Sequence, residues 1–193
     1  MTKMQELPRV EVQSVAELRA WFEEHHTQQE SIWLVTYKKS VPDKYVSIQE
    51  VLDEVLCFGW MDGRRMKLDD ERTMQLLSPR KTQHWSQTYK DHVARLTNEG
   101  RMHEAGLRAV EVAKETGLWD FMNDVDALIK PDDLIEALEQ HPPALQNYEA
   151  FPDSAKRDIL RWIKLAKKPE TRAKRIKEVA ELAAQNKRAS GTS

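Results

Sequence analysis

The order of apolar and polar residues at the start of the chain alternates between a strand pattern and a helix pattern. Residues 9–12 (RVEV) alternate, which is typical of a short strand with one buried face. Ser14 follows, with Glu17 three residues later, and this spacing predicts a capping box at the start of a helix. The apolar stripe of that helix is formed by Val15, Leu18, Trp21 and Phe22. The pattern therefore predicts a strand and an amphipathic helix in succession.

A second strand and a second helix follow. Residues 31–37 (SIWLVTY) are rich in β-branched and aromatic side chains, which favours a central strand. Ser47 and Glu50 form another capping-box pattern before an apolar helix, and Gly59 is predicted to end that helix.

Two further strands are predicted at residues 61–68 and 73–77, joined by the polar turn 69–71. The order of strands and helices up to this point indicates a small mixed β-sheet with helices on one face.

From residue 83 onward the chain shows helical patterns. The predicted helices are 84–98, 102–115, 131–140 and two long helices, of which the first begins at Asp153 and the second at Pro169. The fold class is therefore α+β, with a mixed sheet and helices in the N-terminal part and an all-helical C-terminal part. The predicted regions are a mixed N-terminal region (1–82), a helical C-terminal region (83–188) and a disordered tail (189–193).

Length and composition fit a folded, highly charged protein. The chain has 193 residues, of which 40% are hydrophobic and 32% charged. No run approaches the roughly 18 apolar residues of a membrane span, and the N-terminus lacks the apolar core of a signal peptide, so a cytoplasmic location is expected. Cys57 is the only cysteine, which excludes an internal disulfide and a cysteine-based metal cluster.

The charge changes sign along the C-terminal part. Between Glu115 and Asp153, ten acidic residues accompany a single base, Lys130, whereas residues 154–188 hold twelve Lys or Arg and four acids. These two blocks either neutralise each other within the fold or leave a basic face for an anionic partner, such as nucleic acid phosphates or an anionic membrane surface. Mutual packing is the interpretation that ordinary surface helices favour.

Several residues whose side chains are suited to ligand binding cluster around the predicted helix and strand ends near residues 57–86. Arginines there would bind a phosphate or carboxylate through paired hydrogen bonds, and tryptophans would offer flat stacking surfaces. The candidate ligand-binding residues are Trp60, Asp62, Arg64, Arg80, Trp85 and Ser86. The alternative is structural: an Asp62–Arg ion pair, with both tryptophans filling the seam between the two regions.

No catalytic residue, metal site or cofactor is predicted. The six histidines show no HExxH or similar ligand spacing, and the chain has no GxSxG, P-loop or dinucleotide-binding glycine pattern. Cys57 lies at the end of an apolar helix, where an inert buried thiol is favoured.

A set of spaced motifs runs through the chain, at 56–63 (LCFGWMDG), 78–81 (SPRK), 85–86, 96–102, 105–107, 166–172 (AKKPETR) and 175–176. Together these motifs resemble those of a known family, the YdeI/OmpD-associated or bacteriocin-protection proteins. The resemblance runs from about residue 30 to residue 188 and implies a bacterial stress-protection role, with resistance to bacteriocins suggested by the family's name.

The sequence thus favours a non-enzymatic binding or stress-protection protein whose pocket accepts a small anionic ligand or an acidic peptide. One alternative is an enzyme of unknown reaction that uses Asp62 as acid or base and Arg80 to steady negative charge. Another is nucleic acid binding by the basic C-terminal helices. The pattern does not decide the oligomeric state.

Overall fold

The computed structural model of the chain describes residues 7–81 and 83–189. It divides into two compact units, Met1–Asp120 and Phe121–Ser193, which are described separately below. The sequence pattern places the change of region between residues 82 and 83. The helices within residues 87–115 nevertheless belong to the first unit, because they pack on the same core as the sheet.

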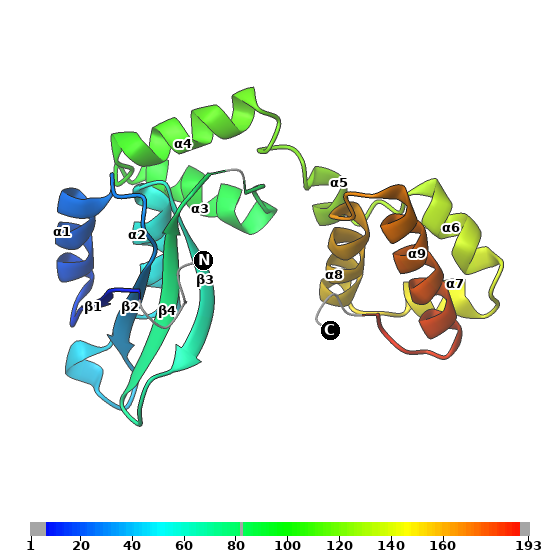
Figure 1. Cartoon of the computed structure of the whole chain (residues 1–193), viewed down its shortest axis with the longest axis horizontal. Coiled ribbons are helices and arrows are strands. Elements are labelled where there is room, and N and C mark those ends of the chain that lie inside the picture. The colour runs from blue at the N-terminus through cyan, green and yellow to red at the C-terminus, as the bar shows by residue number, and fades with distance from the viewer. Residues whose placement is uncertain (1–6, 82, 190–193) are drawn as a thin grey trace. The chain divides into compact units, whose positions relative to one another are not determined.

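The first unit contains a four-stranded mixed sheet, which confirms the predicted fold class (Figure 1). Its strands are β1 (Arg9–Glu11), β2 (Ile32–Tyr37), β3 (Trp60–Lys67) and β4 (Arg72–Pro79). Their order across the sheet is β1-β2-β4-β3, with β1 parallel to β2 and the other pairs antiparallel.

Strand β2 is central, and each of its six residues is buried. Because side chains alternate between the two faces of a strand, Ile32 and Leu34 point to one face and Trp33 and Val35 to the other. Ile32 and Leu34 belong to the main core of the unit. The continuous apolar run that marks this strand in the sequence is thus explained by burial on both faces.

Helices α1 (Val15–His25) and α2 (Ile48–Cys57) begin at the predicted caps, with a short 3₁₀ helix η2 (Pro42–Lys44) between β2 and α2. The Ser47 side chain accepts from the backbone N–H of Glu50, whose carboxylate accepts from the backbone N–H of Ser47, so this capping box is complete. At the first helix Ser14 accepts from the N–H of Glu17, but the Glu17 carboxylate accepts from Gln13 instead of Ser14. Of the two hydrogen bonds of that predicted capping box, only the one accepted by the Ser14 side chain is therefore formed.

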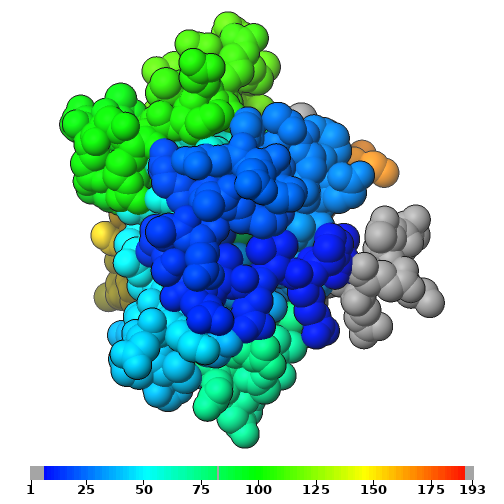
Figure 2. Space-filling model, turned by 90° about the vertical axis from the view of Figure 1, so that its left-hand side faces the viewer, coloured from blue at the N-terminus to red at the C-terminus, as the bar shows by residue number. Residues whose placement is uncertain are grey.

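Helices α3 (Gln87–Asn98) and α4 (Glu104–Glu115) complete the first unit. The first begins three residues later than predicted, because Trp85 is buried in the core and Ser86 takes the extended conformation of an N-cap. Helix α4 packs tightly on the end of α2, where a Cβ added to Gly106 would lie only 2.2 Å from the carbonyl oxygen of Cys57. The space-filling view shows this green helical part next to the blue N-terminal part (Figure 2).

A buried cluster of charges joins α1, α2 and the helical part of the unit. Glu54 is 1% exposed and receives hydrogen bonds from Arg19 at 3.0 Å and Arg101 at 2.8 Å. Its neighbour Asp53 receives a hydrogen bond from Arg95 at 2.6 Å. Buried carboxylates are tolerated only when they are paired in this way.

The second unit is helical, as predicted. Its helices are α5 (Asn123–Asp126), α6 (Asp132–Glu139), α7 (Ala144–Glu149), α8 (Asp153–Lys164) and α9 (Pro169–Ala184). The sequence pattern predicts α6, α8 and α9 but misses α5 and α7, which are too short to show a helical period.

Ala189 is 5% exposed and packs in the core of this unit, although the pattern assigns it to a disordered tail. The rest of that predicted tail, residues 190–193, lies outside the described residues.

The acidic and basic blocks of the C-terminal part pair with each other. Arg172 on α9 makes two hydrogen bonds of 2.8 Å with the Asp133 carboxylate on α6. Lys164 on α8 pairs with Asp124 on α5. Mutual neutralisation, the first of the two interpretations of the charge pattern, is therefore realised at these positions.

Among the described residues, no helix is long and apolar enough to cross a membrane. The same residues contain no group of three or more His, Cys, Asp or Glu side chains that could hold a metal ion. Cys57 is fully buried, and its burial raises the pKa of its thiol to about 11. A thiol in that state is a poor nucleophile.

Candidate anion-binding pocket

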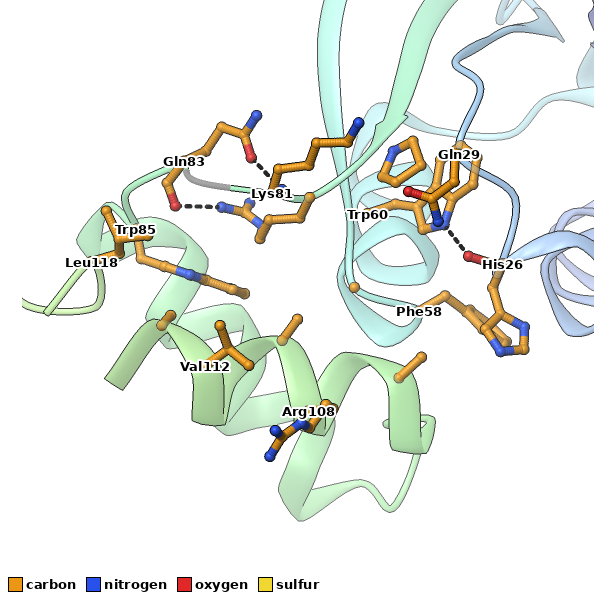
Figure 3. A pocket seen from close by; sticks show the side chains of 16 residues that line it. His26, Gln29, Phe58, Trp60, Lys81, Gln83, Trp85, Arg108, Val112 and Leu118 are labelled. Carbon is orange, nitrogen blue, oxygen red and sulfur yellow. Dashed lines mark hydrogen bonds between the residues drawn. The ribbon is translucent and has the colours of Figure 1, made fainter. Parts of the chain in front are cut away.

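A cavity of about 270 Å³ opens in the first unit at the ends of several elements (Figure 3). Its walls come from the segment after α1, the turn between α2 and β3, the end of β4 with the residues after it, and helix α4. Figure 3 shows Trp85 on one side of the opening and Phe58 with Trp60 on the other. Val112 and Arg108 project from α4 below them.

Arg80 is the most unusual residue of this cavity, because among the described residues no carboxylate pairs with its positive charge. The guanidinium carbon lies 4.0 Å from the centroid of the Trp85 ring and 5.4 Å from that of Tyr89. Nη1 reaches the carbonyl oxygens of Gln83 and His84 only at 3.5 and 3.4 Å. Nε and Nη2 are buried and hydrogen-bond to none of the described residues.

The surroundings of Arg80 disfavour its charge. Burial lowers the pKa of this guanidinium to about 10, and the nearby Tyr89 and Asp62 offset only part of that effect. Within residues 7–81 and 83–189, no ion pair neutralises Arg80. A buried cation held by aromatic rings and distant carbonyls is a site that an anion would complete.

Asp62 is not among the described residues that line the cavity. One oxygen of its carboxylate accepts a 2.6 Å hydrogen bond from the Tyr89 hydroxyl, and the other accepts from the Gln75 amide at 3.2 Å. Asp62 therefore orients Tyr89, whose ring in turn faces Arg80. Both oxygens are therefore engaged by these two side chains, outside the cavity lining.

Trp60 and Trp85 line the cavity, but each is only 1% exposed. The indole N–H of Trp60 donates to the backbone oxygen of His26 at 2.9 Å, and its ring meets Phe22 edge-on. One face of Trp85 is covered by Arg80. The flat stacking surfaces suggested by the sequence are thus largely occupied within the protein, and both rings serve as walls.

The two remaining candidates lie elsewhere. Arg64 is exposed on β3, at the register shift between Asp62 and Arg65, and does not line the cavity. Ser86 is the N-cap residue of α3, where its side chain makes no capping hydrogen bond, and it also lies outside the cavity lining. The structure therefore brings together Trp60, Arg80 and Trp85 of the six candidates.

Five polar lining residues were not identified as candidates from the sequence: His26, Gln29, Lys81, Gln83 and Arg108. Lys81 directly follows Arg80 in the SPRK motif, so its position in the sequence could have indicated it as a further candidate. His26 and Arg108 reach the cavity only because the end of α1 packs beside the start of α4, where the rings of His26 and His103 lie 4.6 Å apart. No spacing in the sequence connects them.

A cavity of about 510 Å³ lies between α6 and α9 in the second unit. Its floor is apolar, with Ala137, Ala173 and Ile176, and the Arg172–Asp133 ion pair stands at its edge. Because this arginine is already neutralised, the cavity has no comparable reason to attract an anion.

The fold and the pocket define a two-unit α+β protein with a cation-lined cavity in its first unit. Residues 10–109, just over half of the chain, match a family described as a domain of unknown function, DUF8412. Residues 127–186 match the family described as "Bacteriocin-protection, YdeI or OmpD-Associated". The chain belongs to the DUF8412 family. The match to the YdeI/OmpD-associated family lies within its second unit.

The resemblance seen in the sequence is confirmed by this second match. Of its motifs, those from 56 to 107 lie in the DUF8412 region and those from 166 to 176 in the YdeI/OmpD-associated region. The candidate pocket is therefore formed mainly by the DUF8412 part. No curated protein and no solved structure matches the chain significantly.

Proposed function

We propose that this protein binds a small anionic ligand in the cavity beside Arg80 and catalyses no reaction there. The observation that carries the proposal is the buried Arg80 guanidinium, which has no carboxylate partner among the described residues. The described lining of the cavity also includes Lys81 and contains no acidic residue, whereas its second arginine, Arg108, is paired with Glu111 at 3.2 Å.

The physical argument is the cost of an uncompensated charge. Taking a cation out of water is unfavourable unless an opposite charge or good hydrogen bonds replace the lost solvation. The contacts of Nη1 at 3.4–3.5 Å are long for N–H···O hydrogen bonds, which usually measure about 2.9–3.0 Å. An anion would first accept a hydrogen bond from Nη1 of Arg80. A small shift of the side chain would then bring Nε or Nη2 to the anion as a second donor.

Asp62 gives the enzymatic alternative little support, because Tyr89 and Gln75 occupy its carboxylate. If the protein were an enzyme with Asp62 as acid or base, an Asp62→Asn variant would lose turnover of any substrate found. The binding proposal instead expects Asp62→Asn to weaken ligand affinity modestly, through looser positioning of Tyr89.

Nucleic acid binding is also less favoured, because Lys164 of α8 and Arg172 of α9 already pair with carboxylates of α5 and α6. Lys167, Lys168 and Lys174 remain exposed. Fluorescence anisotropy with a short labelled oligonucleotide tests this alternative. Binding that falls steeply with added salt would support it, and absence of binding at low salt would remove it.

The test of the proposal is isothermal titration with acetate, glutamate and inorganic phosphate, together with thermal unfolding in the same solutions. A ligand at a hundredfold excess over its dissociation constant stabilises the folded state by about 2.7 kcal/mol, which a thermal shift detects. Arg80→Ala should abolish the effect. Arg64→Ala is the matched control, because it removes the same charge from an exposed site outside the cavity.

If no anion binds, or if Arg80→Ala binds as well as the wild type, the proposal fails. For the cellular role we propose protection against bacteriocins, in the cytoplasm, supported by the family description of the second unit. Survival of cells challenged with a bacteriocin, compared between wild type and Arg80→Ala, tests whether the pocket takes part. Fractionation of the same cells tests the location.

A further inference from the structure

The part of the cavity lining that α4 contributes contains several small apolar side chains, called the alanine floor below. Helix α4 presents Ala105, Ala109 and Ala113 to the cavity at a spacing of four residues, so that they lie along one face of the helix. Phe58 and Leu118 extend this surface on either side. Small side chains leave the space of the cavity open, and the surface they form offers a ligand no hydrogen bonds.

The packing of α4 explains why this floor is fixed. A Cβ added to Gly59 would lie 2.8 Å from the Ala105 carbonyl oxygen and 3.1 Å from the Ala109 side chain. Gly59 has a φ of +70°, which glycine adopts without strain. The turn between α2 and β3 therefore rests directly on the alanines and holds them in place under the opening.

Charge is distributed unevenly around the opening. Arg80 and Lys81 directly follow β4, and both line the cavity. The adjoining cavity shares His26, Ala105 and Arg108 with the first and also carries Glu104 and Glu111, of which Glu111 pairs with Arg108 at 3.2 Å. A negative group is thus attracted to the wall that Arg80 and Lys81 form, whereas Glu104 disfavours it in the adjoining cavity.

The size of the cavity limits the ligand further. Its volume of about 270 Å³ is at the lower end of the roughly 300–1,000 Å³ typical of small-molecule sites. A peptide of several residues does not fit such a space. An inorganic anion would fill only a small part of it and would leave the alanine floor in contact with water.

From these features we infer that the ligand is a small organic carboxylate with an apolar body. The carboxylate binds Arg80 and Lys81, and the apolar body lies on the alanine floor of α4. A single carboxylate matches one buried guanidinium and one exposed ammonium, whereas a dianionic phosphate calls for more donors than this wall provides. The inference rests on the proposed anion-binding function and specifies its ligand class.

The experiment is a titration of the full chain with acetate, benzoate, inorganic phosphate and phenyl phosphate. Benzoate should bind at least roughly tenfold more tightly than acetate, because its ring is removed from water on the alanine floor. Val112→Phe fills the cavity from α4 and should abolish this gain. Glu115→Phe adds the same ring to α4 outside the cavity and should keep it.

Each result separates the inference from the function on which it rests. Arg80-dependent binding of acetate and phosphate without a gain for benzoate would overturn the inference and leave the proposed function standing. Tighter binding of phenyl phosphate than of benzoate would overturn the choice of a carboxylate. If no anion binds, both fail. Because the wild-type series alone decides these outcomes, the test does not depend on the folding of Val112→Phe.

Discussion

Replacing Arg80 by methionine should stabilise the ligand-free protein. Burial lowers the pKa of Arg80 from its ordinary value, by more than two units, to about 10. At about 1.4 kcal/mol for each pKa unit, the charged form costs the native state roughly 3 kcal/mol. Residual solvent around the partly exposed side chain reduces this cost to about 2 kcal/mol. Methionine keeps a similar unbranched stem and removes the charge.

The loss of contacts opposes this gain. The guanidinium lies 4.0 Å from the Trp85 ring centroid, and a cation–π contact of this kind contributes about 1 kcal/mol. The long contacts to the Gln83 and His84 carbonyls contribute little more. The net expectation is that Arg80→Met raises the free energy of unfolding of the first unit by about 1 kcal/mol and its Tm by roughly 4 °C.

Urea unfolding is the appropriate assay, with tryptophan fluorescence and far-UV circular dichroism as two probes. Five of the six tryptophans lie in the first unit, so fluorescence reports mainly on it. Arg64→Met, at an exposed position, should change stability by less than about 0.5 kcal/mol. If Arg80→Met lowers the free energy of unfolding by 1 kcal/mol or more, the reasoning is refuted, because the guanidinium would then stabilise the folded protein overall.

Three further changes test the packing and charges of the first unit. Gly106→Val should destabilise this unit by about 3 kcal/mol in urea unfolding, because even its Cβ would meet the Cys57 carbonyl at 2.2 Å, whereas Gly63→Ala should cost less than 1 kcal/mol. Burial raises the pKa of Asp53, but hydrogen bonds from Arg95 and His92 outweigh it, so the pKa is lowered overall. The stabilisation by the ionised Asp53 carboxylate is therefore present above the ordinary aspartate pKa of 3.8 and is lost as the pH falls below it. In urea unfolding measured at a series of pH values, Asp53→Asn should make the free energy of unfolding fall less steeply below that pH. The buried Cys57 thiol should react with a thiol reagent only after unfolding in urea; rapid reaction of the native protein at pH 7 would contradict its burial.

The sequence by itself determined the local elements of this protein. Alternation marked β1, the long apolar run marked β2, and the Ser47–Glu50 pair marked the start of α2, because caps and periodicity depend on residues only two to four positions apart. The family resemblance and the choice of Arg80 as a candidate residue were also accessible, since each rests on short contiguous motifs in the chain.

Only the tertiary structure decided which residues share the pocket and where the first unit ends. Trp85 extends the sheet's core into α3 and α4, so the unit boundary falls near residue 120 although the strands end at Pro79. His26 and Arg108 reach the same cavity as Arg80 through the packing of α1 beside α4. Arg64, which looks equivalent to Arg80 in the sequence, stays exposed on β3. The reason is physical: burial and the loss of a counter-charge depend on contacts between distant segments, and no local pattern records them.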